Sequence, residues 1–214
     1  MAVAAKICGL SSEAAVKAAV AGGAAYVGFV FYPPSPRAIT AERAAALCVA
    51  VPSGVQRVGL FVDADDTTIG AVLGTAPIDI LQFHGCESPD RIADAKVRFH
   101  RPVMKAVPIA GEEDVLAATR YERDADLLLF DAKPPRRGDA LPGGNGLPFD
   151  WRLIAGRRWR KPWMLSGGLT PETLSDAVRI SGATAVDVSS GVERRPGDKD
   201  PEKIRRFLAI AGIL

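Results

Sequence analysis

The sequence has 214 residues, of which 48% are hydrophobic and 24% are charged, a composition typical of one folded globular domain. Its formal charge of +2 is low for a nucleic-acid-binding protein, so we expect no nucleic-acid partner. No stretch of about 18 apolar residues is free of charges, so we also expect no membrane span.

Short β-type runs alternate with amphipathic, alanine-rich stretches along the whole chain. Strands are predicted at 3–8, 26–31, 56–62, 79–83, 103–107, 126–131, 162–166 and 185–189. Helices are predicted at 12–22, 40–50, 66–74, 89–98, 112–121, 171–180 and 201–211, with a weaker stretch at 150–156. Residues suited to begin a helix precede several of them, namely Ser11 or Ser12, Thr40, Ser88 and Thr170.

Eight βα units with strands that are apolar throughout are typical of a parallel sheet covered on both faces. A closed (β/α)8 TIM barrel accounts for the number of units, and a doubly wound open sheet is the alternative. No linker or break in composition divides the chain, so we predict that residues 1–214 form a single α/β domain.

Polar residues and glycines gather where the predicted strands end. They are Cys8-Gly9, the PPSPR segment after Phe31, Asp63, His84-Gly85, Asp131, Ser166-Gly167-Gly168 and Ser189-Ser190-Gly191. The carboxyl ends of barrel strands meet at one face, which carries the active site in this fold. The sequence therefore predicts one functional site at that face.

Cys8 ends the first predicted strand, and Lys6 points the same way because side chains two residues apart share a face. A lone free cysteine is more often a small buried core residue. A lysine beside it is hard to explain by packing, because an unpaired buried ammonium is costly. We predict that Lys6 lowers the pKa of the Cys8 thiol and binds an anionic intermediate.

The cysteines also indicate the compartment. Cys8, Cys48 and Cys86 form no CxxC pair and have no histidine cluster, which favours a reducing, cytoplasmic location without a zinc site. The apolar first ten residues lack a basic segment and are predicted to be a strand rather than a signal peptide.

Asp131 follows four apolar residues at the end of the sixth strand, where a partly desolvated carboxyl suits a general acid. An aspartate at such a position also commonly closes a turn or caps a helix. The segments 166–169 and 187–193 follow the seventh and eighth strands, and their backbone N–H groups suit a phosphate. The alternative explanation of these glycines is that they form tight turns, which require glycine geometry.

Arg37 stands in a proline-stiffened loop on the predicted site face and suits a carboxylate, although most arginines are solvated surface residues. Lys133, Arg136 and Arg137 follow Asp131 and are predicted to steer an anionic substrate. The basic segment 156–163 precedes the seventh strand, which places it at the opposite end of the barrel. His84 is predicted either to form a hydrogen bond within the site or to have a structural role.

In order along the chain, these segments resemble the phosphoribosylanthranilate isomerase family. The matching segments are KICGL (6–10), GFVFYPPSPR (28–37), VGLFVD (58–63), LQFHG (81–85), LLLFDAK (127–133), GGNGLPFDW (143–151), LSGGLTPE (165–172) and AVDVSSGVE (185–193). Asn145, Pro34 and Phe83 depart from the family's usual residues, but none of the three is a proposed catalytic residue.

The resemblance implies an Amadori rearrangement of the small-molecule substrate phosphoribosylanthranilate, in tryptophan biosynthesis, without a metal or organic cofactor. It implies that Asp131 protonates the furanose ring oxygen and that Cys8 removes the proton from sugar C2. Arg37 would hold the anthranilate carboxylate, and Asp187 would bind sugar hydroxyls. The phosphate would lie against Gly167, Gly168, Ser189, Ser190 and Gly191.

Two other functions remain open at this stage. Another sugar-phosphate enzyme of the same fold, such as the histidine-pathway isomerase or indole-glycerol-phosphate synthase, is the nearest rival; the histidine-pathway isomerase would have an aspartate at position 8. A catalytically silent phosphate-binding regulator is the other, and the paired acid and base argue against it. The sequence allows a monomer or a homodimer.

Overall fold

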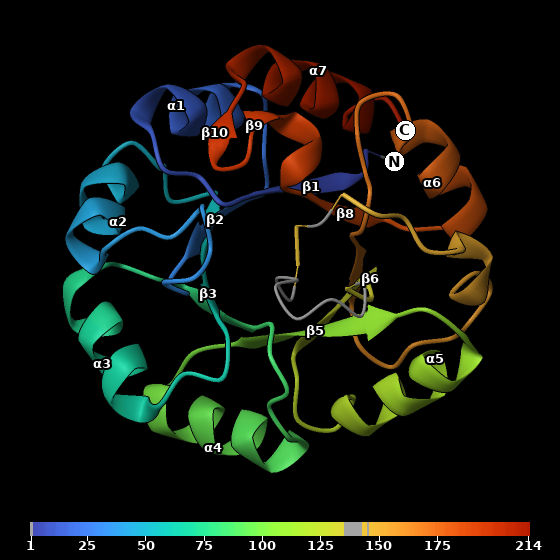
Figure 1. The fold of residues 1–214 in the computed structure, drawn as a ribbon, viewed down its shortest axis with the longest axis horizontal. Coiled ribbons are helices and arrows are strands. Elements are labelled where there is room, and N and C mark those ends of the chain that lie inside the picture. Colours follow the sequence, from blue (N-terminus) through green and yellow to red (C-terminus); the bar gives the residue numbers. More distant parts are fainter. Residues whose placement is uncertain (1, 135–142, 145) are drawn as a thin grey trace.

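The computed structural model describes residues 2–134, 143, 144 and 146–214. Within these residues eight parallel strands form a closed barrel, in which neighbours in the chain are neighbours in the sheet and β8 pairs with β1. Helices form a ring around the strands (Figure 1). The predicted (β/α)8 barrel is confirmed, and closure of the sheet excludes the doubly wound alternative. Of the residues singled out above, Arg136, Arg137 and Asn145 lie outside the described residues.

All eight predicted strands are present, and their ends differ from the prediction by no more than two residues. They are β1 (Ala4–Cys8), β2 (Tyr26–Val30), β3 (Gln56–Phe61), β4 (Ile80–Phe83), β5 (Val103–Ile109), β6 (Leu127–Ala132), β7 (Trp163–Leu165) and β8 (Ala185–Val188). A hairpin that the sequence did not predict follows β8 and consists of β9 (Glu193–Arg195) and β10 (Asp198–Lys199).

The described part of the chain contains seven α-helices: α1 (Glu13–Ala21), α2 (Ala41–Cys48), α3 (Asp66–Thr75), α4 (Pro89–Phe99), α5 (Glu112–Ala118), α6 (Leu174–Ser181) and α7 (Pro201–Ala211). Ser12, Thr40 and Ser88 accept hydrogen bonds from the first turns of their helices, as predicted. The helix predicted from residue 171 starts only at Leu174, because Thr170 closes a turn before it. The weaker stretch at 150–156 contains only the 3-10 turn η2 (Trp151–Leu153). No helix of the described residues is long and apolar enough to cross a membrane.

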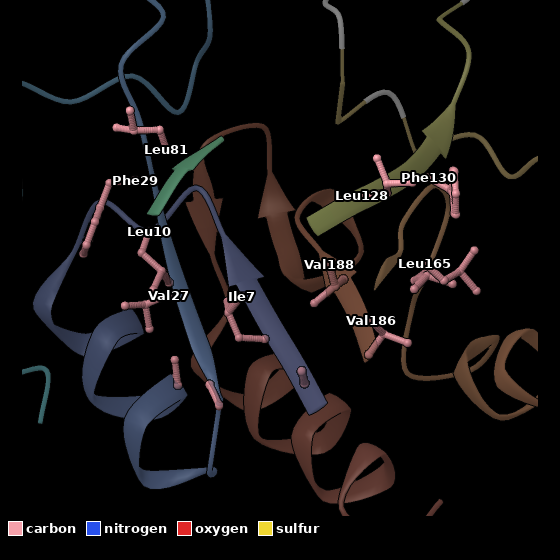
Figure 2. Packing of buried hydrophobic residues seen from close by; sticks show 14 of the residues in the cluster. Ile7, Leu10, Val27, Phe29, Leu81, Leu128, Phe130, Leu165, Val186 and Val188 are labelled. Atoms are coloured by element: carbon pink, nitrogen blue, oxygen red, sulfur yellow. The ribbon is translucent and has the colours of Figure 1, made fainter. Parts of the chain in front are cut away.

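Alternation along the strands separates two sets of side chains. One set, which includes Ile7, Val27, Phe130 and Val186, is buried in the large core cluster between strands and helices (Figure 2). The other set points into the barrel, where a small apolar cluster fills the interior below the site. Its buried members are Val58, Ile80, Met104, Ala106, Leu129 and Met164. Because this apolar cluster fills the interior, the polar residues above it face the open carboxyl end of the barrel.

Candidate active site

An open cavity lies over the carboxyl ends of the strands. Eight of the ten predicted site residues line it: Cys8, Arg37, Asp131, Gly167, Gly168, Asp187, Ser189 and Ser190. Lys6 and Gly191 are not among the described residues that line it. The structure therefore brings most of the predicted residues to one space.

Cys8 lies at the end of β1 in a mainly apolar surrounding. Its side chain clusters with the buried Val30 and Leu60. Gly28 pairs with Cys8 across the sheet, and a Cβ atom there would lie only 3.1 Å from the Cys8 Sγ. Burial raises the pKa of the Cys8 thiol above its ordinary 9.0, although Lys6 acts in the opposite direction. The pKa of Cys8 is therefore raised overall rather than lowered, because the loss of hydration outweighs the effect of the Lys6 ammonium.

Lys6 is fully buried and lies below the floor of the cavity. Its Nζ is 2.8 Å from an oxygen of Asp187, whose other oxygen accepts a hydrogen bond of 3.1 Å from Ser166. Burial lowers the pKa of Lys6, but the charges of Asp187 and Cys8 together raise it to about 12. The ammonium is therefore paired with Asp187, and binding of an anionic intermediate by Lys6 stays a prediction.

Asp131 lies at the end of β6 and faces the cavity. Its Oδ1 accepts a hydrogen bond of 2.8 Å from the backbone N–H of Ala132, and its Oδ2 is 3.2 Å from His84 Nε2. Gly143 and Gly167 leave room around the carboxyl, since a Cβ atom at either would lie about 3 Å from an Asp131 oxygen. Two hydrogen bonds and two glycines hold the carboxyl in place and leave it accessible from the cavity.

The glycine segments after β7 and β8 pack against each other. Gly167 and Gly168 have φ of 84° and 68°, which favours glycine. Ser190 begins the 3-10 turn η3 (Ser190–Val192). Gly191 allows that turn to approach β7's loop, because a Cβ there would lie 1.9 Å from the carbonyl oxygen of Leu169. Gly191 therefore shapes the two-loop wall without lining the cavity.

Arg37 is buried and held by a residue that the sequence analysis did not single out. Its Nε and Nη2 lie 2.8 and 2.9 Å from the two carboxylate oxygens of Glu193. Lys199 Nζ lies 2.7 Å from the same carboxylate and also donates to Ser189 Oγ. In the sequence, Glu193 and Lys199 both lie in the charged segment that follows the last glycine loop, and this segment could have indicated them. The hairpin β9–β10 thus supplies a buried acid and a buried base to the site.

The remaining candidates lie elsewhere or are already paired. Cys48 is buried in α2, and Cys86 is an exposed free thiol. Lys133 is 2.8 Å from Asp114 in an ion pair, so its charge is partly neutralised. The basic segment 156–163 lies at the amino ends of the strands, as predicted, since Arg160 and Lys161 share a hollow with Thr184 and Ala185.

Comparison with known proteins relates this arrangement to one family. The family model described as N-(5'phosphoribosyl)anthranilate (PRA) isomerase matches residues 5–209. A relative from Paracoccus denitrificans, named N-(5'-phosphoribosyl)anthranilate isomerase, is 56% identical over 211 residues, which cover 99% of this chain and 98% of the relative. A relative of the same name from Rhodospirillum centenum is 56% identical over 214 residues and 100% of both chains.

Solved structures agree with these relatives. The crystal structure of phosphoribosyl anthranilate isomerase from Thermotoga maritima is 38% identical, with a TM-score of 0.87, and covers 99% of this chain and 100% of its own. Another isomerase structure contains reduced 1-(o-carboxyphenylamino)-1-deoxyribulose 5-phosphate; it is 36% identical, with a TM-score of 0.84 and the same coverage. The matches extend from β1 to α7.

Proposed function

Because this chain belongs to the N-(5'-phosphoribosyl)anthranilate isomerase family, we propose that Cys8 and Asp131 are the base and acid of its reaction. The reaction is the Amadori rearrangement of N-(5-phosphoribosyl)anthranilate to 1-(2-carboxyphenylamino)-1-deoxyribulose 5-phosphate, a step of tryptophan biosynthesis. The observation that carries the assignment is that Cys8 and Asp131 face one cavity from β1 and β6.

Asp131 protonates the furanose ring oxygen, and the bond between that oxygen and C1 breaks. The nitrogen lone pair forms the Schiff base at C1, and the carboxylate of Asp131 remains. The Cys8 thiolate then removes the proton from C2, which converts the Schiff base to an enolamine. The enolamine becomes the product when C1 gains a proton and the C2 hydroxyl loses one. This sequence requires one acid and one base, each with access to the sugar.

Two anion sites flank the acid and base. Arg37 binds the anthranilate carboxylate, and the adjacent apolar wall of Val30 and Leu60 suits its aromatic ring. The phosphate binds the two glycine loops, with backbone N–H groups as donors around Gly167, Gly168, Ser189 and Ser190, and with Gly191 shaping their approach. Asp187 lines the cavity between them and accepts a sugar hydroxyl.

Lys6 also acts on its neighbours in the site. Its ammonium lies beside both Asp187 and Cys8 and opposes the effect of burial on the thiol. It therefore favours the thiolate and orients Asp187 from below the cavity. A base of this kind must stay reduced, which supports our proposal of a cytoplasmic enzyme. We also propose that the chain is one domain and acts as a monomer or homodimer, since a Thermotoga maritima relative is described as dimeric.

Two substitutions test the assignment. We expect Cys8→Ala and Asp131→Asn each to lower kcat by about a hundredfold or more, the usual contribution of one general acid or base. Phosphoribosylanthranilate formed in situ is followed by the loss of its fluorescence, and binding of the reduced product analogue serves as the control for an intact site. Near-normal kcat in either variant would remove that residue from its role.

A further inference from the structure

A buried glutamine on β4 and the histidine that directly follows this strand lead to the proposed acid. Gln82 has no exposed surface, and His84 follows it two residues later, so both side chains point into the barrel. Gln82 Nε2 lies 3.0 Å from His84 Nδ1, and His84 Nε2 lies 3.2 Å from Asp131 Oδ2. The three side chains form one line of hydrogen bonds from the barrel interior to the cavity.

The direction of these hydrogen bonds follows from the amide nitrogen. Gln82 Nε2 can only donate, so His84 Nδ1 accepts and carries no proton. The neutral ring then has its proton on Nε2, which faces Asp131 Oδ2. The backbone N–H of Ala132 donates to Oδ1 from 2.8 Å. Both carboxyl oxygens thus have a donor.

We infer that Gln82 holds His84 as the neutral Nε2–H tautomer, and that this ring stabilises the Asp131 carboxylate formed when the acid gives up its proton. The inference rests on the proposed role of Asp131. His84 and Gln82 are positioning residues in this scheme, because they act on the reaction through Asp131. A donor that is already aimed at the oxygen where charge develops requires no rearrangement during the reaction.

The other end of the Gln82 amide does not determine this orientation, because Oε1 is buried without a hydrogen-bond partner among the described residues and a reversed amide would place Nε2 there instead. The reversed amide would require a proton on His84 Nδ1 and would leave a bare lone pair of His84 Nε2 facing the carboxylate. Lys105, paired with Glu87, donates to the carbonyl oxygens of Phe83 and Gly85. It therefore fixes the backbone on both sides of His84.

The tautomer can be observed directly because the chain has only two histidines. In protein labelled with 15N-histidine, the shifts of the ring nitrogens show which one carries the proton, and a His100→Gln variant assigns the signals. We expect the His84 proton on Nε2 at neutral pH in the wild type and on Nδ1 in Gln82→Glu, where a carboxylate can accept it. A wild-type proton on Nδ1, or an unchanged pattern in folded Gln82→Glu, would overturn the inference.

Kinetics provide the second measurement. We expect His84→Leu to lower kcat by roughly tenfold to a hundredfold, the effect of losing one hydrogen bond to a charged group, with KM little changed. His84→Gln keeps an N–H donor and should retain more of kcat than His84→Leu. Equal losses in both variants, or a change in KM alone, would contradict the inference. Full activity of Asp131→Asn would instead refute the proposed role of Asp131 as the acid and leave the tautomer result standing.

Discussion

At the scale of single residues, Cys8 combines two opposing influences. Burial favours the neutral thiol and raises its pKa, whereas the ammonium of Lys6 favours the thiolate. Burial therefore disfavours the thiolate, but a buried thiolate is poorly hydrated and reacts readily once formed. Apolar contact with Val30 and Leu60 buries the thiol and thereby raises its pKa. The ion pair between Lys6 and Asp187 limits the opposing effect of the Lys6 ammonium.

The opposing effects of burial and of Lys6 on the pKa of Cys8 predict how this thiol titrates. In a Cys48→Ala, Cys86→Ala background, we expect the rate of Cys8 alkylation by iodoacetamide to rise with pH to a midpoint above 9.0. Lys6→Met should move the midpoint to still higher pH, because it removes a positive charge that stabilises the thiolate. Lys17→Met changes an exposed lysine on α1 and serves as the control. A midpoint that falls or stays in place in Lys6→Met would contradict this account.

Arg37 depends on Glu193 for its position. Burial raises the pKa of Glu193, but its hydrogen bonds with Arg37 and the charge of Lys199 outweigh burial and lower it. The carboxylate is thus ionised at neutral pH and holds two guanidinium nitrogens in one plane. Nη2 also donates a hydrogen bond of 3.3 Å to the carbonyl oxygen of Gly144, and we propose that the rest of the guanidinium binds the substrate carboxylate.

We expect Glu193→Gln to raise KM by about tenfold with a smaller change in kcat, because the loss of one charge-assisted pair costs on the order of 1.4 kcal/mol or more. Steady-state kinetics over a range of substrate concentrations separate the two constants. Glu172→Gln alters a largely exposed pair with Arg206 and should leave both constants unchanged. An unaltered KM in Glu193→Gln would show that Arg37 does not need this partner.

At the scale of elements, the hairpin β9–β10 connects the last barrel strand with the arginine loop. Gly197 lies in its turn with φ of 83°, and a Cβ atom there would lie 2.3 Å from the carbonyl oxygen of Pro36. Pro36 immediately precedes Arg37. The hairpin therefore determines the position of the arginine through two contacts, one at Glu193 and one at its turn.

Gly197→Ala tests the contact at the turn. We expect a several-fold increase in KM, because the new methyl group must displace the loop that carries Arg37. Gly182→Ala is a matched control: its φ is 73°, but nothing lies within 4 Å of its Cβ position, so only backbone strain is added. Both variants should lose some stability, while only Gly197→Ala should change substrate affinity. Equal KM values would contradict the role of the turn.

The elements were predictable to different degrees. The barrel strands were found because each is an apolar run between turn residues, and Cys8 and Asp131 were found because they end such runs. The hairpin was missed because its strands have only three and two residues and no apolar alternation. The partners of Lys6 and Arg37 were missed because Asp187 and Glu193 lie 181 and 156 residues away, and sequence alone does not determine which charges meet.

At the scale of the whole molecule, buried ion pairs join parts of the barrel that are distant in the chain. Lys105 on β5 and Glu87 after β4 are almost fully buried, with Nζ 3.0 Å from the carboxylate. Glu87 also accepts hydrogen bonds from the backbone N–H groups of Asp63 and Gly85. This pair thus ties together the loops that follow β3 and β4.

We expect Lys105→Met to lower the free energy of unfolding by about 3–5 kcal/mol, because it leaves the carboxylate of Glu87 buried without its cation. The double variant Lys105→Met, Glu87→Leu should recover part of that loss. Urea unfolding followed by circular dichroism measures both. Arg179→Met breaks an exposed pair on α6 and should cost less than about 1 kcal/mol. A comparable loss in the exposed control would mean that burial is not the cause.

The pairing of β1 with β8 has a consequence for how the enzyme is made. Lys6 and Cys8 are translated early, but Asp187 and Ser189 follow only after most of the polypeptide has left the ribosome. Cys8, the proposed base, therefore emerges long before the residues that complete its surroundings, and the active site forms only when the two distant strands meet. In a refolding experiment, recovery of turnover would report this final docking step, whereas helical signal would return earlier from the local βα units.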